Sequence, residues 1–63
     1  MYEIFENLLR ERGITAYQVH LATGISTATL SHWKQGLYQP KVEKIRLIAD
    51  YLGVPIDTFY PTN

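Results

Sequence analysis

Apolar residues recur at helical spacing along most of this chain. Phe5, Leu8 and Leu9 stand at positions i, i+3 and i+4, which is the spacing of one face of an amphipathic helix. A longer stripe of the same period follows in the second half of the chain and comprises Val42, Ile45, Ile48, Ala49 and Leu52. No stretch alternates apolar and polar residues with the period of two that is typical of a strand. The pattern therefore predicts an all-α protein.

Glycines and helix-capping residues divide this pattern into short helices. A glycine, which can adopt the left-handed conformation that ends a helix, follows each of the first four predicted helices. Thr15 and Gln18 fit a capping box, and Ser26 is a natural N-cap. We expect a compact five-helix bundle with helices at about Tyr2–Arg12, Ala16–Thr23, Ser26–Gln35, Lys41–Leu52 and Pro55–Tyr60.

The stretch from Thr15 to Gly36 contains two of these helices, joined by a turn at Thr23-Gly24-Ile25. The second helix of the pair has small and polar residues on one side and Leu30 and Trp33 on the other. Five residues are expected to point inward and to fix the angle between the two helices: Val19, Ala22, Ile25, Leu30 and Trp33. A helix held in this way can still present a hydrogen-bonding face to a ligand.

Length and composition limit the classes of protein that the chain can represent. With 63 residues it is expected to form one domain, residues 1–63, and its 46% of hydrophobic residues suffice for a packed core. It has no cysteine, and two histidines are too few and too far apart for a zinc site, so neither a metal nor a cofactor is expected. The longest apolar run is too short to span a membrane, and the pattern of a signal peptide is missing, so a cytoplasmic protein is expected.

Charge is distributed unevenly along the chain. Six basic and six acidic residues give zero net charge, which argues mildly against a protein that neutralises phosphates. No acidic residue lies between Arg12 and Val42, however, and Arg12, Lys34 and Lys41 give that part of the chain three positive charges. The acidic residues are scattered and form no convincing catalytic pair, so an enzyme is not expected.

The whole chain resembles the helix-turn-helix domain of Cro and C1-type phage repressors, the XRE family. The resemblance lies in the spacing of Gly24-Ile25-Ser26, Leu30-Ser31 and Gly36, followed by Pro40 and the helix end Leu52-Gly53-Val54. It implies a lambda-repressor-like fold in which the helix at residues 26–35 enters the major groove of double-stranded DNA.

The resemblance also implies roles for individual polar residues. Base contacts are expected from residues of the recognition helix, namely Thr27, Ala28, Ser31 and His32. Contacts to the DNA backbone are expected near the start of both helices of the pair and after the recognition helix, from Thr15, Tyr17, Gln18, Ser26, Lys34, Gln35, Tyr38, Lys41 and Lys44. Arg10 and Arg12 are expected to be helix-end charges instead.

The chain departs from the family pattern in three respects. His20 stands where the family has an alanine close to the helix crossing, so its ring must turn outward or widen the approach, and we expect a partly exposed structural residue. Lys34 stands where glutamate is common. Thr27 and Ala28 replace strong base readers such as arginine or glutamine, so specificity would depend on His32, on DNA shape, or be weak.

These features predict a sequence-specific, double-stranded DNA-binding transcriptional regulator, a repressor of bacterial or phage origin. It would bind a near-palindromic operator as a homodimer whose recognition helices lie about 34 Å apart. We expect the dimer surface at Pro55 to Asn63, because Phe59 and Tyr60 add apolar area there. Two alternatives stay open: a protein-interaction module of the same fold without DNA binding, and an antitoxin that also binds a protein partner.

Overall fold

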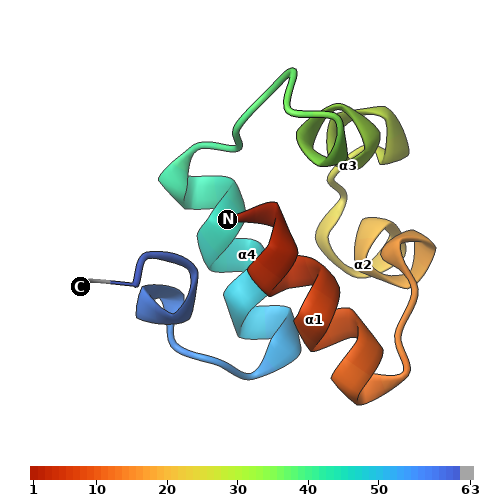
Figure 1. Ribbon diagram of the computed structural model, residues 1–63. Helices are drawn as coiled ribbons and strands as arrows, with labels where there is room; N and C mark the ends of the chain where they lie inside the picture. Colours follow the sequence, from red (N-terminus) through yellow and green to blue (C-terminus); the bar gives the residue numbers. More distant parts are fainter. Residues whose placement is uncertain (62–63) are drawn as a thin grey trace.

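Figure 1 shows the computed structural model of the protein, which describes residues 1–61. The chain forms four α-helices and one 3-10 helix: α1 (Tyr2–Arg12), α2 (Ala16–Thr23), α3 (Thr27–Lys34), α4 (Val42–Leu52) and η1 (Ile56–Phe59). The described residues contain no strand, so the all-α prediction is confirmed. Thr62 and Asn63, the end of the expected dimer surface, lie outside the described residues.

The helices differ in three respects from the sequence prediction. The fifth is a single stretch of 3-10 helix over four residues instead of an α-helix, because Pro55 begins a segment too short for several α-helical turns. The third and fourth helices begin one residue later than expected, since Ser26 and Lys41 have extended backbone and are the N-caps. The third helix also ends one residue earlier than expected, at Lys34, with Gln35 as its C-cap, and the order of the five helical segments is as predicted.

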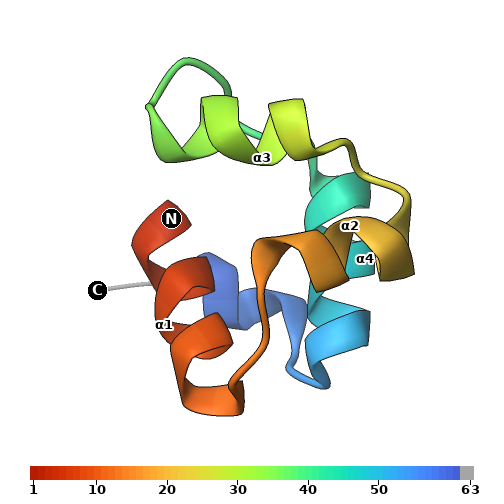
Figure 2. The same ribbon diagram turned by 90° about the vertical axis from the view of Figure 1, so that its right-hand side faces the viewer.

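The helix-turn-helix pair is stacked on the rest of the bundle. α4 contacts both α2 and η1, and α1 also contacts η1. α3 contacts α2 and lies at the rim of the molecule, at the top of Figures 1 and 2. The C-terminal end of α1 is at the opposite, lower side in both views. One long side of α3 is therefore free of the other helices.

A single cluster of buried apolar side chains joins all five elements. Its members come from both predicted stripes, from α2, α3 and η1, and from the turn: Phe5, Leu8, Leu9, Val19, Ile25, Leu30, Trp33, Ile45, Ile48, Ala49, Leu52 and Phe59. Trp33 is 5% exposed, and its ring stacks on that of Phe5 with the ring centres 5.0 Å apart. The prediction that Trp33 is a core residue is confirmed, and this contact attaches α3 to α1.

Two residues that were expected to face the core are exposed. The side of α2 that faces the core carries Val19, which is buried, and Thr23, which is half-buried and four residues later. Ala22 lies on the adjoining face of the helix and is exposed to solvent. Val42 is 47% exposed because it is the first residue of α4, at the end that projects toward the α3–α4 loop. Neither residue therefore contributes to the helix crossing or to the core.

Phe59 and Tyr60 do not both add area to the expected dimer surface. The Phe59 side chain is 1% exposed and lies in the core, because η1 packs against α1 and α4. Tyr60 remains 37% exposed.

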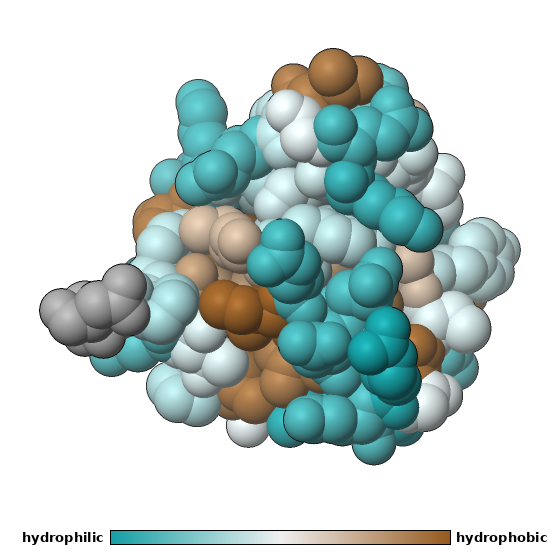
Figure 3. Space-filling model, viewed as in Figure 1, coloured by the Kyte–Doolittle hydropathy of each residue, from teal (hydrophilic) through white to brown (hydrophobic). Residues whose placement is uncertain are grey.

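The most exposed large apolar residue is Leu37, at 73%, and brown apolar atoms are visible at the α3–α4 loop in Figure 3.

Arg12 connects the ends of α1 and α4. Its Nε donates a hydrogen bond to the main-chain oxygen of Leu52, 3.1 Å away, and Nη1 lies 3.7 Å from Glu11 Oε1. The expectation that Arg12 is a helix-end charge is confirmed. This end of α1 lies on the far side of the molecule from α3 (Figure 2). Arg12 therefore adds no positive charge near the recognition helix, and of the three basic residues counted in the central part of the chain only Lys34 and Lys41 remain there.

Candidate nucleic-acid interface

The turn between α2 and α3 is fixed by its own hydrogen bonds. Gly24 has φ +80°, a left-handed conformation that other residues rarely adopt, and its N–H donates to His20 O at 2.9 Å. The Thr23 hydroxyl donates to Val19 O at 2.7 Å and accepts from the Ile25 N–H at 3.2 Å. With Ile25 buried beneath it, the turn holds α3 at a defined angle to α2.

His20 is a structural residue of this turn. Its Nδ1 lies 2.7 Å from the main-chain oxygen of Ile25, five residues ahead. Because a carbonyl oxygen only accepts, Nδ1 must be the protonated nitrogen. The ring is half-buried and lies next to that of Tyr17, with the centres 5.7 Å apart. The histidine thus bends toward the turn, which agrees with the partly exposed structural role expected for it.

The start of α2 is closed by a capping box, as predicted. Thr15 Oγ1 accepts from the Gln18 N–H at 3.2 Å, and Gln18 Oε1 accepts from the Thr15 N–H at 2.8 Å. The cap uses only the oxygen of the glutamine amide, so Nε2 is left to donate elsewhere. Thr15, Tyr17 and Gln18 are all exposed, which is compatible with their expected contacts to the DNA backbone.

The start of α3 is capped by Ser26. Its Oγ accepts from the Thr29 N–H at 3.0 Å and donates to Thr29 Oγ1 at 2.8 Å. Ser26 is therefore an N-cap as predicted, and its hydroxyl hydrogen is already used within the protein. Any hydrogen bond from Ser26 to a phosphate would come from its N–H, because phosphate oxygens only accept.

The four expected base-reading residues lie on the outward side of α3. Thr27 and Ser31 are four residues apart, as are Ala28 and His32, so they form two adjacent columns on the helix surface. All four are exposed, whereas Leu30 is 3% exposed. The structure brings the four together on one face.

Gln35 interacts with one member of this face. Its Nε2 donates to Ser31 Oγ at 3.2 Å. The hydroxyl hydrogen of Ser31 then remains free to donate to an acceptor, such as purine N7 or thymine O4. Gln35 is the C-cap of α3 and was expected at a phosphate, a contact for which the second N–H of its Nε2 remains available.

The expected backbone contacts beyond α3 lie around the α3–α4 loop. The Lys44 ammonium is 5.9 Å from the centre of the Tyr38 ring, a cation–π contact that places these two residues together. Lys41 is the N-cap of α4, and Lys34 lies in the last turn of α3. Lys34 and Tyr38 both line a polar hollow of about 450 Å³ between α1 and this loop.

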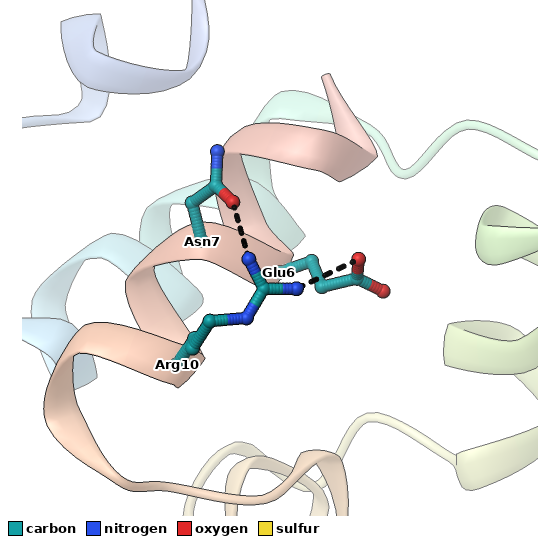
Figure 4. A network of polar contacts seen from close by, with 3 residues as sticks. All are labelled: Glu6, Asn7 and Arg10. Atoms are coloured by element: carbon teal, nitrogen blue, oxygen red, sulfur yellow. Dashed lines mark hydrogen bonds and ion pairs between the residues drawn. The ribbon is translucent and has the colours of Figure 1, made fainter.

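Arg10 is not part of this interface. Its Nη2 lies 3.6 Å from Glu6 Oε1, and its Nη1 donates to Asn7 Oδ1 at 3.3 Å, so the guanidinium bridges two neighbours on α1 (Figure 4). This agrees with the expected role as a helix-end charge. Tyr2, at the start of α1, borders the hollow that Lys34 and Tyr38 line and also a second, smaller groove along α3. No local sequence signal could have indicated this, because only the packing of α1 against α3 brings Tyr2 there.

Comparison with known proteins identifies the family. The model of a helix-turn-helix family matches residues 5–59, which is most of the chain and includes the α2–turn–α3 unit. The chain belongs to the Cro/C1-type helix-turn-helix family. This is a family of DNA-binding domains of XRE-type transcription regulators, not a family of enzymes. Neither the curated proteins nor the solved structures contain a significant match.

Among residues 1–61, no cluster of three or more histidine, cysteine, aspartate or glutamate residues could hold a metal ion. Over the same residues, no helix has the length and apolar character needed to cross a membrane.

Proposed function

We propose that this helix-turn-helix protein is a sequence-specific transcriptional regulator that inserts α3 into the major groove of double-stranded DNA. In this proposal it acts as a repressor, of bacterial or phage origin, in the cytoplasm. Bound at a promoter, the domain would exclude polymerase by occupying the DNA.

The observation that supports the proposal is the two-sided character of α3. Leu30 and Trp33 fix one side in the core, while Thr27, Ala28, Ser31 and His32 remain exposed on the other. All four exposed side chains are small or planar, so the helix is slim enough for a groove about 12 Å wide. A rigid helix with a free polar face loses little conformational freedom on binding.

The expected base contacts follow from the chemistry of these side chains. Ser31 donates to a purine N7 or a thymine O4, and His32 donates to guanine N7 or O6. The Ala28 methyl packs against a thymine methyl, and Thr27 donates to or accepts from a base edge. With no arginine or glutamine at Thr27 and Ala28, the strongest single reader in this set is His32.

Backbone contacts hold α3 in register. We assign them to Thr15, Tyr17 and Gln18 at the start of α2, to Ser26 and Gln35 at the ends of α3, and to Lys34, Tyr38, Lys41 and Lys44 beyond it. The lysine ammonium groups neutralise phosphates and release counterions, so affinity should fall steeply with salt. The net charge of the chain is zero, so the proposed attraction to phosphates depends on these three lysines and not on the charge of the whole molecule.

The dimension of the molecule is compatible with a dimer on DNA. Its principal extents are 30 × 25 × 20 Å, so two protomers side by side can place their α3 helices about 34 Å apart, one turn of DNA. The operator would then be nearly palindromic. Of the apolar residues proposed for the dimer surface, Tyr60 is exposed and Phe59 is not, which makes a weak self-association without DNA the expected behaviour.

Selection of bound duplexes from a random pool, followed by fluorescence anisotropy on the selected sequence, tests this function. A palindromic consensus with half-sites one turn apart is expected. The affinity should fall as the salt concentration is raised from 50 to 200 mM, with a slope of log affinity against log salt concentration that is roughly proportional to the number of phosphates contacted. If the protein binds no duplex with a Kd below about 1 mM at low salt, the proposal is wrong and a protein-interaction role is favoured.

A further inference from the structure

A second groove, of about 220 Å³, opens beside the recognition helix. It lies between the N-terminal ends of α1 and α2 and one side of α3, and its lining residues are Tyr2, Ala16, Thr27, Leu30, Ser31 and Lys34. Thr27 and Ser31 also belong to the exposed face proposed to read bases. The groove is therefore continuous with the proposed DNA interface.

Tyr2 is held beside this groove by core packing. Its ring meets that of Trp33 edge-on, with centres 5.2 Å apart and an interplanar angle of 86°. It also contacts Phe5 edge-on at 5.5 Å. Because both partners are buried, the orientation of Tyr2 is fixed by the fold. A pre-oriented hydroxyl needs little ordering when it binds a ligand.

The groove has the chemistry of a site for an anion with an apolar part. Its lining contains the Lys34 ammonium and no acidic residue. Burial, and to a lesser degree the Glu6 carboxylate, raise the pKa of the Tyr2 hydroxyl above 10.0, so the group is protonated at neutral pH and can donate. Glu6 is itself paired with Arg10 at 3.6 Å (Figure 4), which partly neutralises its charge.

We propose that this groove binds a sugar-phosphate of the DNA backbone and that Tyr2, the first residue of α1, is a further DNA-contacting residue. The Tyr2 hydroxyl donates to a phosphate oxygen, the Lys34 ammonium neutralises the charge, and Ala16 and Leu30 contact the deoxyribose. A phosphodiester fits this lining because it joins an anion to an apolar sugar face. The inference rests on the proposed function and adds a contact outside the helix-turn-helix pair.

The test compares Tyr2→Phe with the wild type. The variant keeps the ring and its packing against Trp33 and Phe5, and removes only the hydroxyl. Its affinity should fall roughly five- to tenfold, as for the net loss of a typical hydrogen bond, and by the same factor on the selected operator and on random duplex. Tyr51→Phe, an exposed tyrosine on α4, is the matched control and should bind like the wild type.

A second measurement locates the contact on the DNA. Phosphates of the operator are replaced one at a time by neutral methylphosphonate, and each duplex is titrated with both proteins. At one phosphate per half-site the replacement should weaken the wild type several-fold more than it weakens Tyr2→Phe, because the interaction is already missing in the variant. At all other positions the two proteins should lose affinity equally.

Several outcomes overturn the inference. Wild-type affinity of Tyr2→Phe would show that the hydroxyl makes no contact. A loss on the operator alone, with random duplex unaffected, would place Tyr2 in base readout instead of backbone contact. In both cases the wild type still binds DNA and the proposed function stands. If the wild type binds no duplex, the proposed function and this inference fail together.

Discussion

His20 Nδ1 lies 2.7 Å from the main-chain oxygen of Ile25 and so connects the last turn of α2 to the last residue of the turn that leads to α3. The bond spans Gly24, whose left-handed conformation has no side-chain support of its own. His20 stands where the family has a small residue close to the helix crossing, and its side chain is accommodated there because it makes this hydrogen bond. The helix-turn-helix angle in this protein depends in part on a polar contact.

Replacing His20 with alanine should destabilise the fold. The Ile25 carbonyl, which lies in a partly buried contact, would lose its partner, and the free energy of unfolding should fall by about 1–2 kcal/mol. Thermal denaturation followed by circular dichroism should show a midpoint lower by roughly 5–10 °C for a domain of this size. His20→Ala melting within 1 °C of the wild type would mean that the hydrogen bond contributes nothing.

Replacing His32 with alanine should weaken binding to DNA and leave the stability of the fold nearly unchanged. His32 is exposed on α3, so its loss should change the free energy of unfolding by less than about 0.5 kcal/mol. Binding to the selected operator should weaken by about 1–3 kcal/mol, while affinity for random duplex stays the same. The two histidine variants thus act as controls for each other. Unchanged operator affinity of His32→Ala would exclude this residue as a reader.

Gln18→Glu separates the capping role of this residue from its proposed DNA contact. A glutamate at this position preserves the capping box and suits the positive end of the helix dipole, so stability should be equal or higher by a few tenths of a kcal/mol. The carboxylate should repel phosphate and weaken binding to any duplex at low salt. Asn7→Asp, which makes the same charge change on α1, is the matched control. Equal affinities of both variants would place the start of α2 away from the DNA backbone.

Trp33→Ala should remove most of the stability of the domain. The indole is 5% exposed and packs against Tyr2 and Phe5, and truncation of such a side chain costs about 3–5 kcal/mol. That is a large fraction of the 5–15 kcal/mol typical of a whole domain, roughly speaking. Leu37→Ala, at a residue 73% exposed, should melt like the wild type. A Trp33→Ala midpoint within a few degrees of the wild type would contradict the core assignment.

Local sequence determined most of the secondary structure and most of the core. The capping box at Thr15 and Gln18, the Ser26 cap and the glycine after each α-helix depend only on residues within one turn of each other, so spacing alone predicted them. The same is true of Trp33, whose distance of three residues from Leu30 places both on one side of α3. The outward position of the base-reading face followed from this spacing as well.

Tertiary packing decided what spacing could not. Ala22 and Val42 have the helical period of core residues, yet they are exposed because no other element covers their side of the helix. His20 was ambiguous in sequence because its orientation depends on an acceptor across the turn. Arg12 lies away from α3 because α1 ends beside α4, and Tyr2 borders the groove along α3 because α1 begins beside α3. Helical period fixes which residues share a face, whereas only the packing of helices determines which faces are covered.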